Sequence, residues 1–308
     1  MITLLLPLLL QGVIIKTKAL FAGRVGAPLL QPYHDVIKLL QKGFVFSRTT
    51  TWVFALGTIA NLVAIMIASL IVPFGHVPYG QGGDMPMSFA GDVILLAYLL
   101  ALSRFFLTLA ALDTGSSFEG MGAAREVTFA CLAEPTMFFG FLSLAVISGS
   151  TSLEGMLGTS LAGAWHSGAA ALLLVLVSWF IVLLAENSRI PFDDPNTHLE
   201  LTMIHEVIVL DHSGPVLGMV LYAAAVKMFL FAALVVRVAV PFSTGVPLLD
   251  WIVFLAGVLG VAVLVGVVES TMARYRMPEI PKVLATACAL SALALLLLAS
   301  LGTPITQN

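Results

Sequence analysis

The sequence predicts an all-α integral membrane protein, a bundle of about eight transmembrane helices with short amphipathic helices on the cytoplasmic side. Of its 308 residues, 59% are apolar and only 10% are charged, whereas soluble globular chains carry about 25% charged residues. Apolar runs of roughly 20 residues, the length that crosses the hydrocarbon core, recur along the whole chain. We therefore expect one membrane domain over residues 1–308 within a lipid bilayer.

The predicted spans lie at 2–20, 52–72, 91–112, 125–148, 168–186, 215–238, 250–272 and 283–301. In the first span, Lys16 and Lys18 leave a short apolar run. That run fits either a truncated helix or a helix completed by lysines whose ammonium groups reach the membrane surface. The fourth span carries several charges around Pro135, so we expect it to be kinked and packed inside the protein.

Lone charges also lie within three other predicted spans; they are Asp92, Arg104, Lys227 and Glu269. Arg104 and Lys227 lie deep within their spans. A charge at that depth is costly unless it is paired, so we expect both to face the bundle interior and to pair with acids. Asp92 and Glu269 lie near helix ends, where we expect them to reach water.

The distribution of lysine and arginine predicts the orientation of the chain. The basic segments are 16–48, 113–125, 186–214 and 274–282; they alternate with 73–90, 149–167, 239–249 and the C-terminus, which lack Lys and Arg. Basic loops stay in the cytoplasm. This pattern predicts a multi-pass protein of the cell inner membrane, with both termini outside and the basic segments in the cytoplasm.

The first basic segment is predicted to contain an amphipathic helix that starts at Pro32 and lies on the membrane surface. Its apolar stripe consists of Tyr33, Val36, Ile37, Leu39 and Leu40, and its polar face of Asp35, Lys38 and Lys42. We interpret Lys38 and Lys42 as a solvated basic face. The preceding stretch holds Arg24, Gly26 and Pro28, and its glycines let the backbone approach another surface closely. With Asp35, it is a candidate docking surface or chamber wall.

The second basic segment breaks the helix at residues 115–117 and then carries Glu119, Arg125, Glu126 and Glu134. Glu134 lies inside an apolar run, where a carboxylate must be protonated, paired or hydrated. One interpretation is a functional ionisable group, which we favour. The alternative is a structural ion pair that fixes helix packing.

The third basic segment is unusually acidic. It contains Glu186, Arg189, Asp193, Glu200, Glu206 and Asp211. A solvated acidic loop is one interpretation, because the orientation rule counts only Lys and Arg. However, residues 199–210 are too apolar for a freely solvated loop. We therefore expect a re-entrant or peripheral helix buried against other helices.

No residue set predicts a cofactor in this chain. His198, His205 and His212 recur every seven residues, but ligands seven apart on a helix are about 10 Å apart, too far to share one ion. We expect these histidines to relay protons or to bond neighbouring acids. Cys131 and Cys288 are too few for an iron–sulfur cluster, which usually takes about four cysteines. Any redox centre must therefore lie on partner subunits.

Three segments, taken in order, resemble one family. They are "GRVGAPLLQPYHDVIKLL", "GSSFEGMGAAREVTFACLAEP" and "AENSRIPFDDPNTHLEL". The same order and topology occur in the complex I subunit 1 family. The stretch "RIPFDDPNTHLELTMIHE" is most similar to the branch found in formate hydrogenlyase, hydrogenase 4 and other energy-converting [NiFe] hydrogenases.

The resemblance implies a membrane anchor beneath a catalytic arm, with acids that form a proton path toward antiporter-like membrane subunits. By motif, Arg24 matches the arginine of the family's first cytoplasmic loop. The path residues carried over in the same way are Glu134, Glu186, Glu200, Asp193, Arg125 and Arg189, and secondary candidates are Glu119, Glu206, Asp211, His198, His205 and Lys227. Where complex I proteins carry two further acids, this chain has Asn196 and His198, which favours the hydrogenase branch.

Three functions follow as hypotheses. The first is the ion-path subunit of a membrane-bound hydrogenase, without a cofactor of its own. Its partners would be the hydrogenase large and small subunits, an iron–sulfur protein and antiporter-like subunits, with no nucleic acid; the NiFe centre and iron–sulfur clusters would lie on those partners. The second is a quinone-binding complex I subunit. The third, an independent secondary transporter, is disfavoured because the sequence shows no internal repeat.

Overall fold

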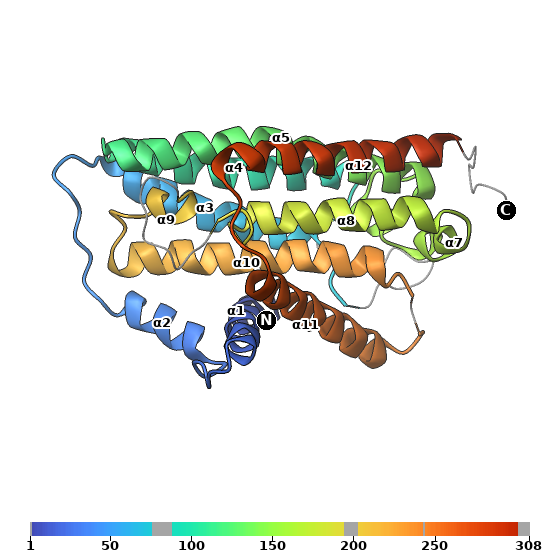
Figure 1. The fold of residues 1–308 in the computed structure, drawn as a ribbon, viewed down its shortest axis with the longest axis horizontal. Helices are drawn as coiled ribbons and strands as arrows, with labels where there is room; N and C mark the ends of the chain where they lie inside the picture. Colours follow the sequence, from blue (N-terminus) through green and yellow to red (C-terminus); the bar gives the residue numbers. More distant parts are fainter. Residues whose placement is uncertain (1, 76–87, 194–202, 243, 301–308) are drawn as a thin grey trace.

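The computed structural model describes residues 2–75, 88–193, 203–242 and 244–300, and every regular element among them is helical (Figure 1). The elements are α1 (Ile2–Phe21), α2 (Gln31–Leu40), α3 (Trp52–Ile71), α4 (Asp92–Asp113), α5 (Ser117–Ser148), α6 (Leu153–Met156), α7 (Thr159–Ser167), α8 (Ala169–Glu186), α9 (His205–Ile208), α10 (Gly214–Ala239), α11 (Pro247–Thr271), a 3₁₀ turn η1 (Met277–Glu279) and α12 (Ile280–Ser300). The prediction of an all-α membrane bundle is confirmed.

Eight of these helices, within the described part of the chain, are long and apolar enough to cross a membrane. They match the eight predicted spans closely, with one boundary in error. We expected the fourth span to begin at residue 125, but α5 begins at Ser117 and runs unbroken through Pro135. The first span, in doubt because of its lysines, is helical from Ile2 to Phe21.

The bundle is layered around α10. In Figure 1, α4, α5 and α12 form one side, α3 and α8 lie next to α10, and α1, α2 and α11 form the other side. Of the apolar window of α10, 72% is buried, against 28% for α11 and for α12. Helices α11 and α12 therefore expose much of their apolar surface on the outside of the bundle, whereas α10 forms the core.

Close helix contacts depend on small residues, as is usual in membrane bundles. A Cβ atom at Gly57 of α3 would lie 2.7 Å from the Phe106 carbonyl oxygen of α4. The aromatic ring of Trp179, 1% exposed, lies over Gly140 and packs edge-on against Phe141 at 4.8 Å between ring centroids. These contacts hold α3 against α4 and α8 against α5.

Two short helices lie near one end of the bundle, at the left of Figure 1. Helix α2 is amphipathic as predicted, and Val36 is buried against the bundle, but Ile37 and Leu40 of the predicted stripe are about half exposed. Helix α9 buries Val207 and Ile208 and packs on Gly122 of α5. The apolar residues before α10 therefore do form a buried peripheral helix, though a short one.

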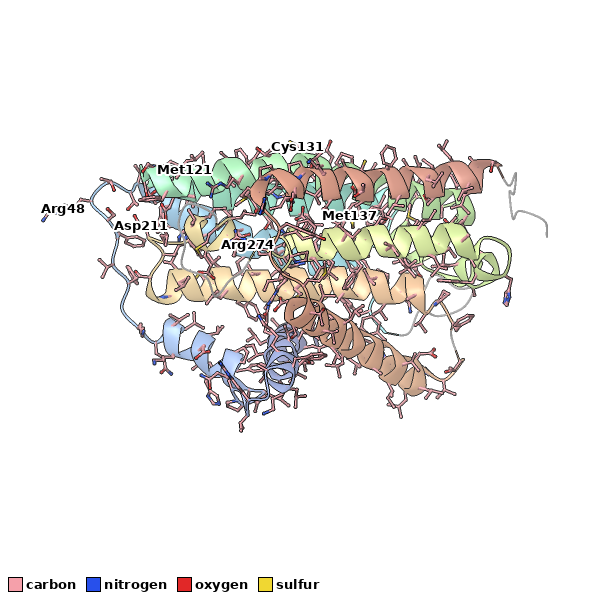
Figure 2. All side chains as sticks on the ribbon, in the orientation of Figure 1. Arg48, Met121, Cys131, Met137, Asp211 and Arg274 are labelled. Atoms are coloured by element: carbon pink, nitrogen blue, oxygen red, sulfur yellow. The ribbon has the colours of Figure 1, made fainter. Side chains whose placement is uncertain are left out.

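The segments around these helices also contact one another. Ser213 exchanges two hydrogen bonds of 3.2 Å with the backbone of Val45. Figure 2 places Arg48 at the far left end of the molecule and Arg274 near its middle. Along the long axis of Figure 2, the linker between α11 and α12 therefore lies closer to the middle of the molecule than the segment that holds Arg48.

Candidate functional site

A buried arginine organises the centre of the bundle. The guanidinium of Arg104, on α4, pairs with Glu134 of α5 and Glu186 of α8, with 2.6 Å between Nη2 and Glu186 Oε2. Its Nε lies 3.6 Å from Glu126 Oε1. The side chain of Arg104 is only 8% exposed. A charge at this depth is tolerated because three carboxylates surround it.

A lysine brings a second cation into the same group. Lys227 Nζ, on α10, lies 2.8 Å from Glu186 Oε2. The carboxylate of Glu186, 6% exposed, therefore bridges two cations from different helices. We call the five side chains from α4, α5, α8 and α10 the Arg104 cluster; they are Arg104, Lys227, Glu126, Glu134 and Glu186. The expectation that Arg104 and Lys227 pair with acids is confirmed.

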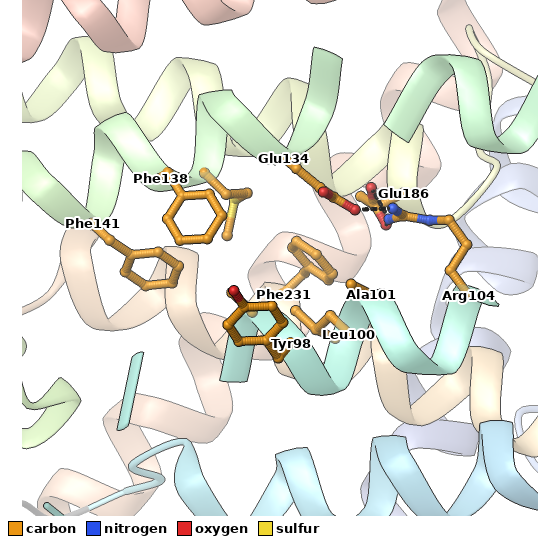
Figure 3. A pocket seen from close by; sticks show the side chains of 11 residues that line it. Tyr98, Leu100, Ala101, Arg104, Glu134, Phe138, Phe141, Glu186 and Phe231 are labelled. Carbon is orange, nitrogen blue, oxygen red and sulfur yellow. Dashed lines mark hydrogen bonds and ion pairs between the residues drawn. The ribbon is translucent and has the colours of Figure 1, made fainter. Parts of the chain in front are cut away.

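An aromatic cavity of about 290 Å³ adjoins this cluster (Figure 3). Its apolar wall includes Tyr98, Met137, Phe138, Phe141 and Phe231, and Arg104, Glu134 and Glu186 line it as well. In Figure 3 the charged groups lie at one end of the cavity and the aromatic rings at the other. Unlike Glu186, Glu134 has a side chain that is 44% exposed, so the cluster is accessible from this side.

A second charged group lies between α1, α11 and the turn after α8. Glu269 pairs with Lys18 at 2.8 Å and with Arg189 at 3.4 Å, and Arg189 also donates to Gln11. The side chain of Glu269 is fully buried. The expectation that Glu269 reaches water was therefore wrong, because the ends of α11 and α1 pack together there.

Asp92 contradicts the same expectation. It is 1% exposed, and its Oδ1 accepts a hydrogen bond of 2.7 Å from the Leu153 amide. That amide is one of the unpaired donors at the start of α6. The carboxylate is therefore a structural cap that joins α4 to α6, and no charged cluster surrounds it among the described residues.

Asp193 connects three segments around a polar chamber. Its Oδ2 accepts bonds from the amides of Ile204 at 2.9 Å and His205 at 3.1 Å, and its Oδ1 lies 2.9 Å from Arg274 Nη2. The chamber, of about 320 Å³, is lined by residues of α1, α2, α9, α10 and α11. Its ionisable lining is Lys18, Asp35, Arg189, Asp193, His205, Glu206 and Glu269.

A smaller cavity of about 40 Å³, the junction, lies between the other two. It shares Asn187, Ser188, His205 and Ala224 with the polar chamber, and it shares Arg104 and Glu186 with the aromatic cavity. Three neighbouring cavities with shared lining residues therefore lie in series between the Glu269 region and the open side of Glu134.

The other predicted residues are placed away from these cavities. Arg24, Gly26 and Pro28 are exposed on the loop between α1 and α2. Arg125 donates to the Met203 carbonyl at 2.8 Å. Glu134, on the same helix, pairs with Arg104 of α4. Glu119, fully buried, accepts from the Asp211 amide at 3.0 Å. His198 and Glu200 lie outside the described residues.

Of the two expected histidines that the structure describes, His205 and His212, only His205 has a hydrogen bond to an acid, through its backbone. Asp193 bonds the backbone of His205, whereas His212 Nε2 lies 3.2 Å from the Thr58 hydroxyl and its ring stacks 4.4 Å from Phe54. Burial, with a smaller effect of nearby His205, lowers the pKa of His212 to about 4. His212 is therefore neutral at physiological pH. Among the described residues no group of His, Cys, Asp and Glu is arranged to hold a metal ion.

Comparison with known proteins identifies the family. A family model described as NADH dehydrogenase matches residues 1–300. The chain is 34% identical over 300 residues to Hydrogenase-4 component C of Escherichia coli (strain K12), covering 95% of this chain and 91% of that protein. It is 28% identical to Formate hydrogenlyase subunit 4 of the same organism, covering 89% and 88%.

More distant relatives carry another name. A subunit of the NADH-quinone oxidoreductase of Paraburkholderia phymatum (strain DSM 17167 / CIP 108236 / LMG 21445 / STM815) is 25% identical, covering 84% of this chain and 75% of that protein. A chain in the structure of the membrane-bound sulfane sulfur reductase, an archaeal respiratory membrane complex, superposes with a TM-score of 0.77 at 21% identity, covering 95% of each chain, and shows the shared fold. The chain belongs to the NADH dehydrogenase family, of the complex I subunit 1 type, and is a membrane subunit of a complex I-like assembly.

Proposed function

We propose that this chain is the membrane-anchor and ion-path subunit of a membrane-bound [NiFe] hydrogenase or formate hydrogenlyase-type complex. It would couple electron transfer in a docked cytoplasmic arm to translocation of protons or sodium ions. The observation that carries this proposal is the Arg104 cluster, in which ionisable groups of four membrane-crossing helices meet beside a cavity.

The charges of this cluster do not balance. Three carboxylates face two cations, so one negative charge remains when all five groups are ionised. A surplus charge inside a bilayer is costly, which favours uptake of one proton or cation by the cluster. The three carboxylates surround the same two cations, so an ion bound there would interact with the cluster as a whole.

The position of Glu134 favours passage over a purely structural role. Glu186 is buried between Arg104 and Lys227, whereas Glu134 is nearly half exposed beside the aromatic cavity. A carboxylate left open to lipid on a membrane helix is unfavourable. We therefore assign this face to antiporter-like membrane subunits, which would cover Glu134 and accept the ion.

The names of two relatives support assigning hydrogenase partners to this chain. These two relatives are components of hydrogenase 4 and formate hydrogenlyase. We assign the large and small hydrogenase subunits and an iron–sulfur protein to the cytoplasmic side, docked on residues 23–48 and 186–214. The NiFe centre and the iron–sulfur clusters would lie on those partners, and this chain would cross the cell inner membrane.

The polar chamber favours a second function, that of a quinone-binding complex I subunit. Its lining combines apolar side chains of α1, α2 and α10 with Lys18, Arg189 and Glu269. A quinone has a mostly apolar ring and two polar carbonyl oxygens, so it requires a site of this mixed character. A photoreactive quinone analogue that labels Leu8 or Val36 in the assembled complex would select this alternative. Absence of labelling together with hydrogen-dependent ion uptake would select the hydrogenase function.

The ion path is tested by Glu134→Gln, which retains the shape and hydrogen bonding of the side chain but removes its charge. In sealed vesicles that contain the assembled complex, we expect normal complex abundance, retained electron transfer and strongly reduced ion uptake. Glu279→Gln, at an exposed carboxylate outside every cavity described above, is the matched control. It should leave complex abundance, electron transfer and ion uptake unchanged. Normal uptake by the Glu134 variant would exclude the proposed path. Reduced abundance with proportionate uptake would support a structural ion pair.

A further inference from the structure

Three buried polar atoms of side chains that line the junction have no hydrogen-bond partner among the described residues. One is Arg104 Nε, which lies 3.6 Å from Glu126 Oε1; the other two are Asn187 Oδ1 and His205 Nε2. The side chains of Asn187 and His205 line the junction and the polar chamber alike. Buried polar groups in proteins are nearly always bonded, to protein or to ordered water. The unsatisfied atoms of Asn187 and His205, beside the same small cavity, therefore indicate a ligand that the described residues do not supply.

The protein fixes the orientation of Asn187. Its Nδ2 donates to the Leu183 carbonyl at 2.7 Å. A carbonyl only accepts hydrogen bonds, so the amide nitrogen must face Leu183 and Oδ1 must point away from it. The next residue, Ser188, is buried and has a φ of 49°. This left-handed conformation, rare outside glycine, turns the chain sharply after α8.

The position of His205 is fixed from its backbone. The amides of Ile204 and His205 both donate to Asp193, and Asp193 is held in turn by Arg274. The start of α9 is thereby tied to the turn after α8. The imidazole of His205 is left without a side-chain bond at Nε2 among the described residues.

The junction has the size and polarity that water requires. A cavity needs about 10–15 Å³ to hold one water molecule, with 2–4 polar partners. The junction offers about 40 Å³. Besides Asn187 and His205, its lining includes the polar side chains of Asn61, Ser103, Glu126, Glu186 and Lys227.

We infer that ordered water binds in the junction between Asn187 Oδ1 and His205 Nε2 and forms the proton connection between the polar chamber and the Arg104 cluster. The inference rests on the proposed ion path and identifies its internal link. Water can donate to Asn187 Oδ1, and it can either donate to or accept from His205 Nε2, depending on the tautomer of the imidazole. A proton taken up by this water on the chamber side, and another released to Glu126 or Glu186, leaves the water unchanged.

In this arrangement His205 and Asn187 are positioning residues. Their task is to hold water, for which a polar side chain of suitable length is sufficient. His205→Gln supplies an amide in place of the imidazole and does not titrate, so it should retain the water. His205→Leu and Asn187→Leu are of similar size and apolar, so they should exclude it.

The experiment compares these variants with Glu186→Gln in vesicles that contain the whole complex, measuring proton uptake per electron transferred. We expect His205→Leu and Asn187→Leu to lower uptake about tenfold or more, as an added barrier of about 1.4 kcal/mol would. His205→Gln should stay near the wild-type value, and Glu186→Gln should lose uptake. His166→Leu, at an exposed histidine of α7, is the control and should behave as wild type.

Each other result is decisive. Normal uptake in both leucine variants, with loss in Glu186→Gln, would overturn the water junction and leave the ion path intact. Normal uptake in Glu186→Gln would overturn the ion path, and the junction with it. Equal loss in His205→Gln and His205→Leu would assign the proton to the imidazole and not to water. If the leucine variants fail to assemble, a high-resolution map of the wild-type complex decides: water density within hydrogen-bond distance of both atoms supports the inference, and a dry junction overturns it.

Discussion

Lys227 Nζ lies 2.8 Å from Glu186 Oε2, which joins the middle of α10 to the last residue of α8 inside the bundle. Glu186 also receives the guanidinium of Arg104. The Glu186 carboxylate is therefore shared by two cations, and these cations differ in the number of carboxylates near them. Removing Lys227 leaves Glu186 with Arg104, whereas removing Arg104 affects three carboxylates at once.

We expect Arg104→Met to destabilise the subunit strongly, since breaking a buried ion pair costs roughly 3–5 kcal/mol. Lys227→Met should cost less, because Glu186 keeps its bond to Arg104. The measurement is the amount of assembled complex in membranes, with Lys38→Met on the exposed face of α2 as the control. Equal amounts in all three variants would contradict a structural contribution from Arg104.

The contact between α5 and α9 gives a prediction about packing. A Cβ atom at Gly122 would lie 3.0 Å from Val207 Cγ1 and 3.1 Å from the Ile204 carbonyl oxygen, whereas one at Gly120 would meet nothing within 4 Å. Gly122→Val should therefore displace α9 and cost about 1–3 kcal/mol. Gly120→Val, on the same helix, is the matched control. Thermal unfolding of the purified complex distinguishes them, and equal melting temperatures would contradict the close contact.

The pKa of His212 predicts how stability depends on pH. Burial lowers this pKa to about 4, below the ordinary value of about 6.5. The unfolded chain therefore binds a proton more readily than the folded chain below pH of about 6.5, and stability falls as the pH drops from there toward about 4. The stability that the folded chain gains from keeping His212 neutral is therefore fully present above pH of about 6.5.

His212→Gln should remove this contribution. The melting temperature of the purified variant should depend less on pH between about 4 and 6.5 than that of the wild type. Exchange of the exposed His34 on α2 for Gln is the control, and it should leave the wild-type slope unchanged. An unaltered slope in the His212 variant would show that the imidazole titrates alike in the folded and unfolded chain, and would contradict the lowered pKa.

The features of the fold that depend on local composition could be predicted from the sequence. Length and hydropathy determine the eight spans, and a deep lone charge must be paired, so the pairing of Arg104 and Lys227 with acids could be anticipated. The start of α5 could not, because its first turns carry Glu119, Arg125 and Glu126, which end an apolar window. Those turns are helical because they pack against α9, a contact that hydropathy does not encode.

The partners of the charges were also beyond the sequence. The sequence indicated that Glu134 must be protonated, paired or hydrated, but nothing local identified Arg104 of α4 as its partner. Glu269 was assigned to water from its place near a helix end, whereas α1 and the turn after α8 bury it. Asn187 drew no attention because an amide carries no charge. Its importance follows only from an unbonded atom beside a cavity.

The loop before α2 gives the last prediction, which concerns assembly. This loop is fixed to α1: Lys16 Nζ donates to the Val25 carbonyl at 2.7 Å, and Gly26 packs on Ala19. The side chain of Val25 is nevertheless 86% exposed. Leu29 and Leu30 of the same loop are also 44% and 55% exposed, and apolar side chains exposed together are typical of an interaction surface. If the cytoplasmic arm docks here, deleting residues 24–30 should release the hydrogenase arm from membranes while its dye-linked activity remains.

A point variant separates docking from folding. Val25→Asp leaves the backbone bond to Lys16 in place, so the subunit should remain in the membrane at normal abundance while the arm is released. Leu248→Asp is the control, since Leu248 is also mostly exposed, at 71%, and lies at the start of α11, far from the loop in sequence. This variant should retain the arm. Both quantities are measured by fractionation, with hydrogenase activity assayed in the soluble and membrane fractions. An arm that stays bound in the Val25 variant and in the deletion would place the docking surface elsewhere on the chain.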